Sequence, residues 1–139
     1  MAQTNYQSST NEGVNGADGE DGYLFITVSQ AAAATSTTII SNAFTSTSVA
    51  TTSRIVVFEE NVATPTLNTD IVASISRDGG STFTTATLSD SGYVTGSSGQ
   101  RILTGTATIS GQPSGQSMRW KLALANNTVK IHGVALQWS

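Results

Sequence analysis

The feature that most constrains the fold is a pair of alternating segments joined by Asp78-Gly79-Gly80. In residues 71–76, Ile-Ala-Ile alternates with Val-Ser-Ser, and in residues 83–88, Phe-Thr-Thr alternates with Thr-Ala-Leu. This is the two-residue period of β-strands. Glycine adopts a positive φ without steric cost, and the Asp78 carboxylate can accept hydrogen bonds from the turn. We therefore predict one β-hairpin over residues 70–88. Because an isolated hairpin is marginal in water, the rest of the chain must supply the sheet that covers it.

The turn of this hairpin, residues 76–83, reads Ser-Arg-Asp-Gly-Gly-Ser-Thr-Phe. It resembles the Asp-box, Ser-x-Asp-x-Gly-x-Thr-Trp/Phe, of sialidase propeller blades and many secreted and viral β-proteins. That resemblance implies a hairpin and not a catalyst, with the Asp78 carboxylate capping turn amides and Phe83 anchored in the core. The chain has no repeat that would build a propeller. We therefore expect a structural role for the residues that match the box: Ser76, Asp78, Gly80, Thr82 and Phe83.

The composition favours one all-β domain. The chain has 139 residues, only 11% of them charged, and it is rich in Ser and Thr, which suit the outer faces of strands and the turns between them. Alternating Val, Ile and Phe runs argue against disorder. We predict an antiparallel β-sandwich, jelly-roll-like, over residues 23–139. Besides the hairpin, its expected strands are residues 23–29, 37–40, 53–60, 101–109, 117–125 and 128–138, with a weaker one within 41–52.

Three local features refine this prediction. Residues 89–99 are rich in Ser and Gly and are expected to form a long connection. Asn126-Asn127 fits a two-residue primed turn, because Asn tolerates positive φ better than most residues. The inward and outward phases of the last strand change at His132-Gly133, which predicts a β-bulge there.

Residues 1–22 are polar and glycine-rich and are expected to form an extended arm. They carry four acidic residues and no basic one, whereas residues 91–139 carry four basic residues and no acidic one. Such opposite charges can steer the arm toward its own body or a neighbour's, although a solvated tail has the same composition. The spacing of these acidic residues does not fit a calcium-binding loop. The candidate arm interface is Tyr6, Glu12, Asp18, Glu20 and Asp21.

The candidate basic contact face, which could meet an acidic partner such as the arm, is the outward side of residues 117–125. There Arg119 and Lys121 alternate with apolar residues, so they form either a contact face for an acidic partner or ordinary solvated surface.

Catalytic, metal and nucleic-acid signals are not found. The chain has no Cys and one His, His132, and it lacks a Gly-x-Ser-x-Gly elbow. Glu59 and Glu60 are neighbours on a predicted strand and must point to opposite faces. The sequence pI of about 4.8 argues against nucleic acid, and no segment resembles a signal peptide or a membrane span. We expect no enzyme activity, cofactor, metal, nucleic acid or membrane partner.

Five blocks of the sequence carry a family resemblance: residues 74–83, 101–103, 110–115, 118–121 and 130–139. In the same order, they resemble the carboxy-terminal β-domain of tail-fibre-like and other virion proteins of tailed bacteriophages. The likeness covers about residues 53–139. In long fibres this domain ends a much larger chain, whereas here it follows one short arm and a few strands, which favours a small accessory subunit.

This resemblance implies a non-enzymatic virion protein, made in the host cytoplasm. The leading hypothesis is a capsid decoration (cement) subunit that forms a homotrimer and binds the major capsid protein or other virion proteins. The alternative is a tail-fibre or receptor-binding tip that contacts host glycans through residues 89–99 and 110–115. A glycan-active enzyme is a third, less favoured class.

Overall fold

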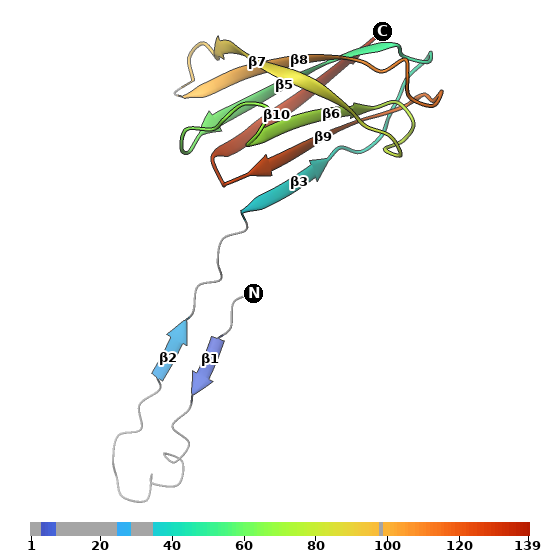
Figure 1. The fold of residues 1–139 in the computed structure, drawn as a ribbon. Coiled ribbons are helices and arrows are strands. Elements are labelled where there is room, and N and C mark those ends of the chain that lie inside the picture. The colour runs from blue at the N-terminus through green and yellow to red at the C-terminus, as the bar shows by residue number, and fades with distance from the viewer. Residues whose placement is uncertain (1–3, 8–24, 29–34, 98) are drawn as a thin grey trace, which may run out of the picture. The chain divides into compact units, whose positions relative to one another are not determined.

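The computed structural model describes residues 4–7, 25–28, 35–97 and 99–139, which hold ten β-strands and no helix (Figure 1). The chain divides into two units, Met1–Ala33 and Ala34–Ser139. In the first unit, β1 (Thr4–Gln7) pairs antiparallel with β2 (Phe25–Val28). The sequence places the arm boundary after residue 22 and predicts no strand at β1, whose polar residues give no alternation signal.

The second unit, here called the body, is one antiparallel sheet of eight strands in the order β10-β5-β8-β7-β6-β9-β3, with β4 also paired to β9. The strands are β3 (Ser36–Ile40), β4 (Phe44–Thr45), β5 (Thr52–Asn61), β6 (Ile71–Ser76), β7 (Thr84–Tyr93), β8 (Gln100–Thr108), β9 (Ser117–Ala125) and β10 (Val129–Trp138).

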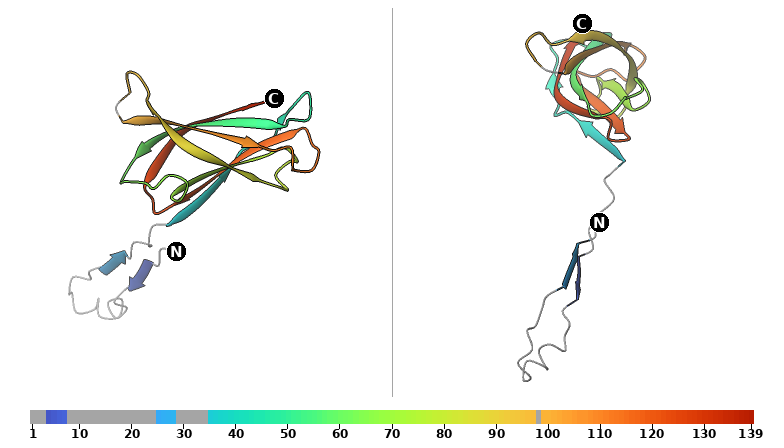
Figure 2. Two further views of the ribbon diagram at one scale, coloured as in Figure 1. Left: turned by 45° about the horizontal axis from the view of Figure 1, so that its top comes forward. Right: turned by 90° about the vertical axis from the view of Figure 1, so that its left-hand side faces the viewer.

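The sheet curls at β7, which pairs with a strand of each half of the sheet. The start of β7 pairs with β6, through Thr84 to Ala86, and its later part pairs with β8, beginning at Thr87. Seen end-on, the strands curve around a common interior (Figure 2). The predicted all-β class and the antiparallel pairing are confirmed. The strands of the body form one continuous curled sheet, and the two-layer jelly-roll sandwich stays a prediction.

The core lies inside this curl and follows the alternation read from the sequence. On β5, Ile55 and Val57 are fully buried, and on β8 Leu103 is fully buried while Gly105 takes the next inward position. A Cβ at Gly105 would lie 2.9 Å from the backbone oxygen of Thr87, so only glycine allows β7 to approach this closely. The other large buried apolar side chains are Ile71, Ile75, Leu88, Ile109, Met118 and Leu122.

Most strand predictions are confirmed within a residue or two of each end, and so is the bulge, where the pairing of β10 with β5 shifts between Ile131 and Gly133. The weak expectation within residues 41–52 corresponds to the short β4. The strand expected over residues 23–29 is described only as β2, in the first unit.

One local prediction is wrong, and another is confirmed only in its backbone conformation. Residues 89–93 belong to β7 and not to a connection, because the strand continues past an irregularity between Asp90 and Tyr93. Asn126 and Asn127 do have positive φ, 61° and 49°, but they close no hairpin. β9 pairs with β3, β4 and β6, whereas β10 pairs with β5, so this turn carries the chain from one half of the curled sheet to the other.

One buried arginine ties the loops at one end of the body together. Arg77 is 6% exposed, and its guanidinium donates to the backbone oxygens of Ala50 (2.7 Å), Ser110 (2.9 Å), Pro113 (3.1 Å) and Gln112. Its own backbone N–H donates to Oε1 of Gln112 at 2.8 Å. Five N–H groups of one residue therefore bind two separate segments, Ala50 and residues 110–113, and we call this arrangement the Arg77 clamp.

Replacing Arg77 by Met should lower the free energy of unfolding by about 3 kcal/mol or more, because the carbonyl oxygens that the guanidinium binds would stay buried without a donor. Urea unfolding followed by tryptophan fluorescence measures this. The matched control is Arg54→Met, since Arg54 is an exposed residue of β5. A change of less than about 1 kcal/mol for Arg77→Met would contradict the clamp's importance.

Candidate functional site

The residues that match the Asp-box are joined by hydrogen bonds in the turn between β6 and β7. The Ser76 hydroxyl donates to Oδ1 of Asp78 at 2.7 Å, and the same oxygen accepts from the backbone N–H of Thr82 at 2.9 Å. The backbone N–H of Gly80 donates to the Ser76 oxygen at 2.9 Å, and Gly80 has a φ of +98°. The carboxylate thus caps the turn, as expected for a structural role.

Asp78 is strongly favoured in its charged form. Burial acts to raise its pKa, but the hydrogen bonds from Thr82 and Ser76 outweigh it and lower the pKa from 3.8 to about 2. Its second carboxylate oxygen, Oδ2, is buried and has no hydrogen-bond partner among the described residues. The charge therefore stabilises the turn over the whole physiological range of pH.

Phe83 lies elsewhere than expected. Its side chain is half-buried, outside the core cluster, and the Lys121 ammonium lies 4.2 Å from its ring centroid. The adjacent Thr84 accepts a hydrogen bond from the buried Gln112 at 2.8 Å. Because consecutive residues of an extended chain face opposite ways, the inward position belongs to Thr84 and leaves Phe83 on the other side.

The basic candidates, Arg119 and Lys121, both stand on β9 and alternate with the inward Met118 and Leu122. Arg119 donates to the backbone oxygen of Ser41 at 3.2 Å. Within the described part of the chain neither residue forms an ion pair. They remain candidates for contact with an acidic partner.

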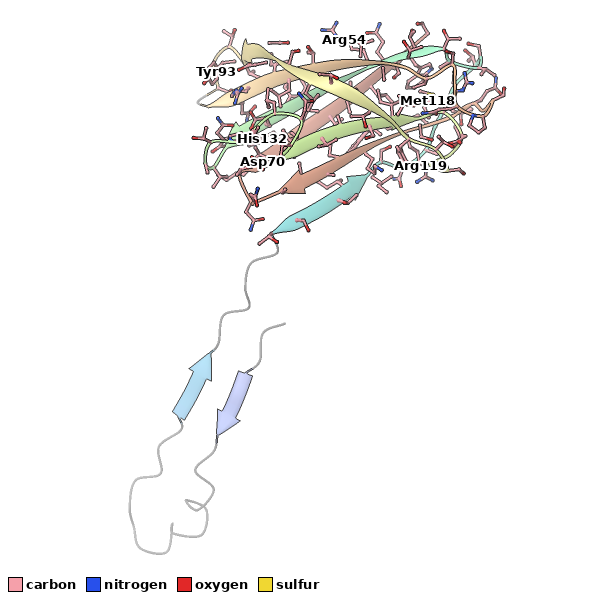
Figure 3. The ribbon with its side chains drawn as sticks, in the orientation of Figure 1. Arg54, Asp70, Tyr93, Met118, Arg119 and His132 are labelled. Atoms are coloured by element: carbon pink, nitrogen blue, oxygen red, sulfur yellow. The ribbon has the colours of Figure 1, made fainter. Side chains whose placement is uncertain are left out.

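A cluster of charges occupies the opposite end of the body. Figure 3 places Tyr93 and His132 toward that end and Met118 and Arg119 toward the other. Glu59 is fully buried, and one of its oxygens lies 3.4 Å from Nη1 of Arg101. Arg101 also pairs with Asp90 at 2.5 Å.

Glu59 is the least satisfied group in this cluster. Both of its carboxylate oxygens are buried without a hydrogen-bond partner among the described residues. Burial raises its pKa from 4.5, and the nearby positive charge of Arg101 opposes this without cancelling it. A buried ion pair of this kind costs desolvation energy and is weak support for stability.

The neighbouring Glu60 faces the other side, as predicted. It is half-exposed and binds the Lys130 ammonium at 3.2 Å and a ring nitrogen of His132 at 3.0 Å. The hydrogen bonds from Lys130 and His132 lower the pKa of Glu60. His132 therefore contacts a carboxylate at the bulge and not a nucleophilic side chain.

The arm candidates are only partly described. Tyr6 lies on β1 opposite Ile26 of β2. The four acidic candidates fall outside the described residues: Glu12, Asp18, Glu20 and Asp21.

Two other kinds of site are absent from the described residues. Among the residues that the structure describes, no group of three or more His, Asp or Glu side chains is placed to hold a metal ion. The described ranges also contain no helix with the length and hydropathy needed to cross a membrane.

The surface feature that the sequence does not reveal is an open edge. β10 pairs with β5 along one side, and no described strand pairs with its other side. Four of its side chains pack against the core yet stay only half-buried, and we call this row the β10 seam: Ile131, Val134, Leu136 and Trp138. The ring of Trp138 lies 6.4 Å from that of Phe44, so β4 covers one end of the seam.

Comparison of the chain with protein-family models, with curated proteins and with solved structures finds no match.

Asp78→Asn should remove about 1–2 kcal/mol of stability at neutral pH, since the depressed pKa of Asp78 adds stability above its unfolded value of 3.8. This difference from wild type should shrink as the pH falls from 3.8 toward 2. Urea unfolding between pH 2 and pH 7 measures it, with Asp18→Asn of the arm as the control. A pH-independent difference would contradict the role of the charge.

Glu59→Gln should leave the protein at least as stable as wild type at pH 8. A raised pKa means that the contribution of Glu59 is largest below its unfolded value of 4.5 and is lost as the pH rises through the folded pKa. In Glu59→Gln, this pH-dependent loss of stability should be absent, whereas Glu60→Gln should still show it. Arg101→Met should cost about 3 kcal/mol, because it leaves Glu59 buried without a cation. A marked loss at pH 8 for Glu59→Gln would show that the carboxylate stabilises the fold.

Proposed function

We propose that this protein is a non-enzymatic structural subunit of a tailed-bacteriophage virion, and specifically a capsid decoration protein. It is made in the host cytoplasm, forms a homotrimer on the capsid surface and binds the major capsid protein. The resemblance of residues 53–139 to phage virion β-domains supports the class of particle. The fold of the body supports a role in assembly.

The observation that carries the proposal is the open edge of β10 with its half-buried apolar row. An unpaired strand edge is a template for another chain, and natural proteins cover or disrupt such edges unless they use them. Here Val134, Leu136 and Trp138 would gain burial from a partner, at about 25 cal/mol for each Å² of apolar surface removed from water. A subunit whose surface is completed by its neighbours suits a particle component.

The strand pairing also supports a finer statement about the fold. β5 pairs with β10, β6 with β9 and β7 with β8, so that each pair encloses the next along the chain. Such nested antiparallel pairing is typical of jelly rolls, which are common in viral capsid proteins. We therefore propose that the curled sheet is a jelly-roll-like sandwich whose two layers share β7. This likeness concerns architecture alone, so it favours a capsid protein but does not by itself determine a function.

The arm supports decoration over an isolated monomer. Residues 1–22 carry only negative charges, and the body presents Arg119 and Lys121 without ion-pair partners among the described residues. Opposite charges favour an arm that orders on a neighbouring subunit, which adds contacts between capsomers.

A second candidate function is a receptor-binding tip that contacts host glycans. It is favoured by Tyr93, which is 65% exposed and lies opposite Arg101 in the sheet. Asp90 and Asn61 bind the same arginine, so an aromatic ring stands beside planar polar groups, a combination that suits sugars. Copy number separates the candidates: a decoration protein occurs in proportion to the capsid subunits, and a tail tip in only a few copies.

Phage particles made without this protein should lose resistance to heat and osmotic shock, and adding the purified protein back should restore it. The physical reason is mass action, since a subunit that binds only the assembled shell stabilises it. Surviving plaque-forming units after heating or rapid dilution give the readout.

The control is adsorption to host cells, which should be unaffected by the deletion. Unchanged particle resistance together with failed adsorption would overturn decoration in favour of the receptor-binding tip. Turnover of host glycans by the purified protein would overturn both.

A further inference from the structure

We propose that the free edge of β10 binds β2 of a second copy of the chain, so that each body completes its sheet with a neighbour's strand. This inference rests on the proposed homo-oligomeric subunit and names the surfaces that hold it together. It depends on two incomplete surfaces that occur in the same chain.

The first incomplete surface is the later part of β10. Gly133–Trp138 reads Gly-Val-Ala-Leu-Gln-Trp, with no charge and no Pro, and its outer edge has no described partner. Exposed strand edges are usually protected by charges, by Pro or by bulges. β10 has such devices only in its first part, where Lys130 and the shift at His132 stand.

The second incomplete surface is β2. Among the described strands it pairs only with β1, and the register runs from Thr4 opposite Val28 to Gln7 opposite Phe25. A two-stranded ribbon is marginal in water, and a third strand or a packed face is needed for independent stability. The residues of β2, Phe-Ile-Thr-Val, all have high strand propensity. Adding β2 to β10 gives each a partner that its own unit does not provide.

The proposed strand exchange would also allow a closed oligomer to form. A contact between β2 of one copy and β10 of the next uses two different surfaces, so the interface is heterologous. Heterologous interfaces close into rings when the rotation between subunits allows it, and a trimer is the smallest such ring above a dimer. Strand addition supplies main-chain hydrogen bonds, while the β10 seam supplies apolar contact.

The chain has no cysteine, which permits a direct test by site-specific crosslinking. Thr27→Cys places a thiol on β2, and Ala135→Cys places one on an exposed position of β10. The two single-cysteine proteins are unfolded in urea, refolded as a mixture and treated with a short bismaleimide. The mixture should give a crosslinked pair, in about tenfold higher yield than a mixture with a control thiol, because binding raises the local thiol concentration.

Two matched controls locate the contact. Thr106→Cys is exposed on β8, in the middle of the sheet, and Thr38→Cys is exposed on β3, at the opposite edge. Strong crosslinking of Thr27→Cys to Thr38→Cys and not to Ala135→Cys would overturn the assignment to β10. Crosslinking only within one chain, in a Thr27→Cys/Ala135→Cys double variant, would overturn exchange between copies.

A second variant tests the same contact without crosslinking. Ile26→Asp lies outside the body, so the body should keep its unfolding free energy while the oligomer dissociates to monomers in light scattering after size exclusion. An oligomer of unchanged mass would overturn the proposal. Particle resistance is measured separately. If strand exchange occurs but the protein does not change particle resistance, only the decoration function is overturned. If the protein protects particles but strand exchange does not occur, only the exchange is overturned.

Discussion

The fold depends on a buried cation that is solvated by backbone oxygens and that pairs with no acidic side chain among the described residues. Arg77 is suited to this because its planar guanidinium offers five N–H donors in fixed directions. It binds carbonyl oxygens from the segment before β5 and from the loop after β8, which adjoin the ends of these two paired strands. Gln112 reinforces the arrangement by donating to Ile75 and Thr84. One end of the curled sheet is therefore held by polar contacts that a hydrophobic core alone would not supply.

The alternation of side chains made the strands predictable, but it could not predict which strands lie at the edges. Met118 and Leu122 are fully buried, whereas Trp120 and Leu124, on the same face of β9, are only half-buried. Burial along one face of β9 therefore depends on what packs over each position, which local periodicity does not encode. The Asp78 turn was predictable because its partners lie within four residues. The bond between Arg77 and Gln112 joins residues 35 positions apart, and no local signal marks it.

The two ends of the body use charge in opposite ways. Asp78 is stabilised in its charged form by hydrogen bonds within its own turn, so it favours folding above its depressed pKa. Glu59 faces inward on β5, where the alternation would otherwise place an apolar residue, and burial raises its pKa. Arg101 limits the cost by pairing with both Glu59 and Asp90. The turn with Asp78 thus adds stability, while the Glu59 end retains a polar group that a more stable body would replace.

We interpret the edge of β10, which no described strand pairs, as part of the function that we propose. β10 is protected by Lys130 and a bulge in its first part, but residues 133–138 carry no charge, and the inward side chains there are only half-buried. A monomer under selection for solubility would be expected to place a charge or a Pro in this stretch. The uncharged, half-buried stretch at the end of β10 therefore indicates that another chain covers this edge. That argument, more than the resemblance to phage proteins, favours a molecule whose role is contact with other subunits.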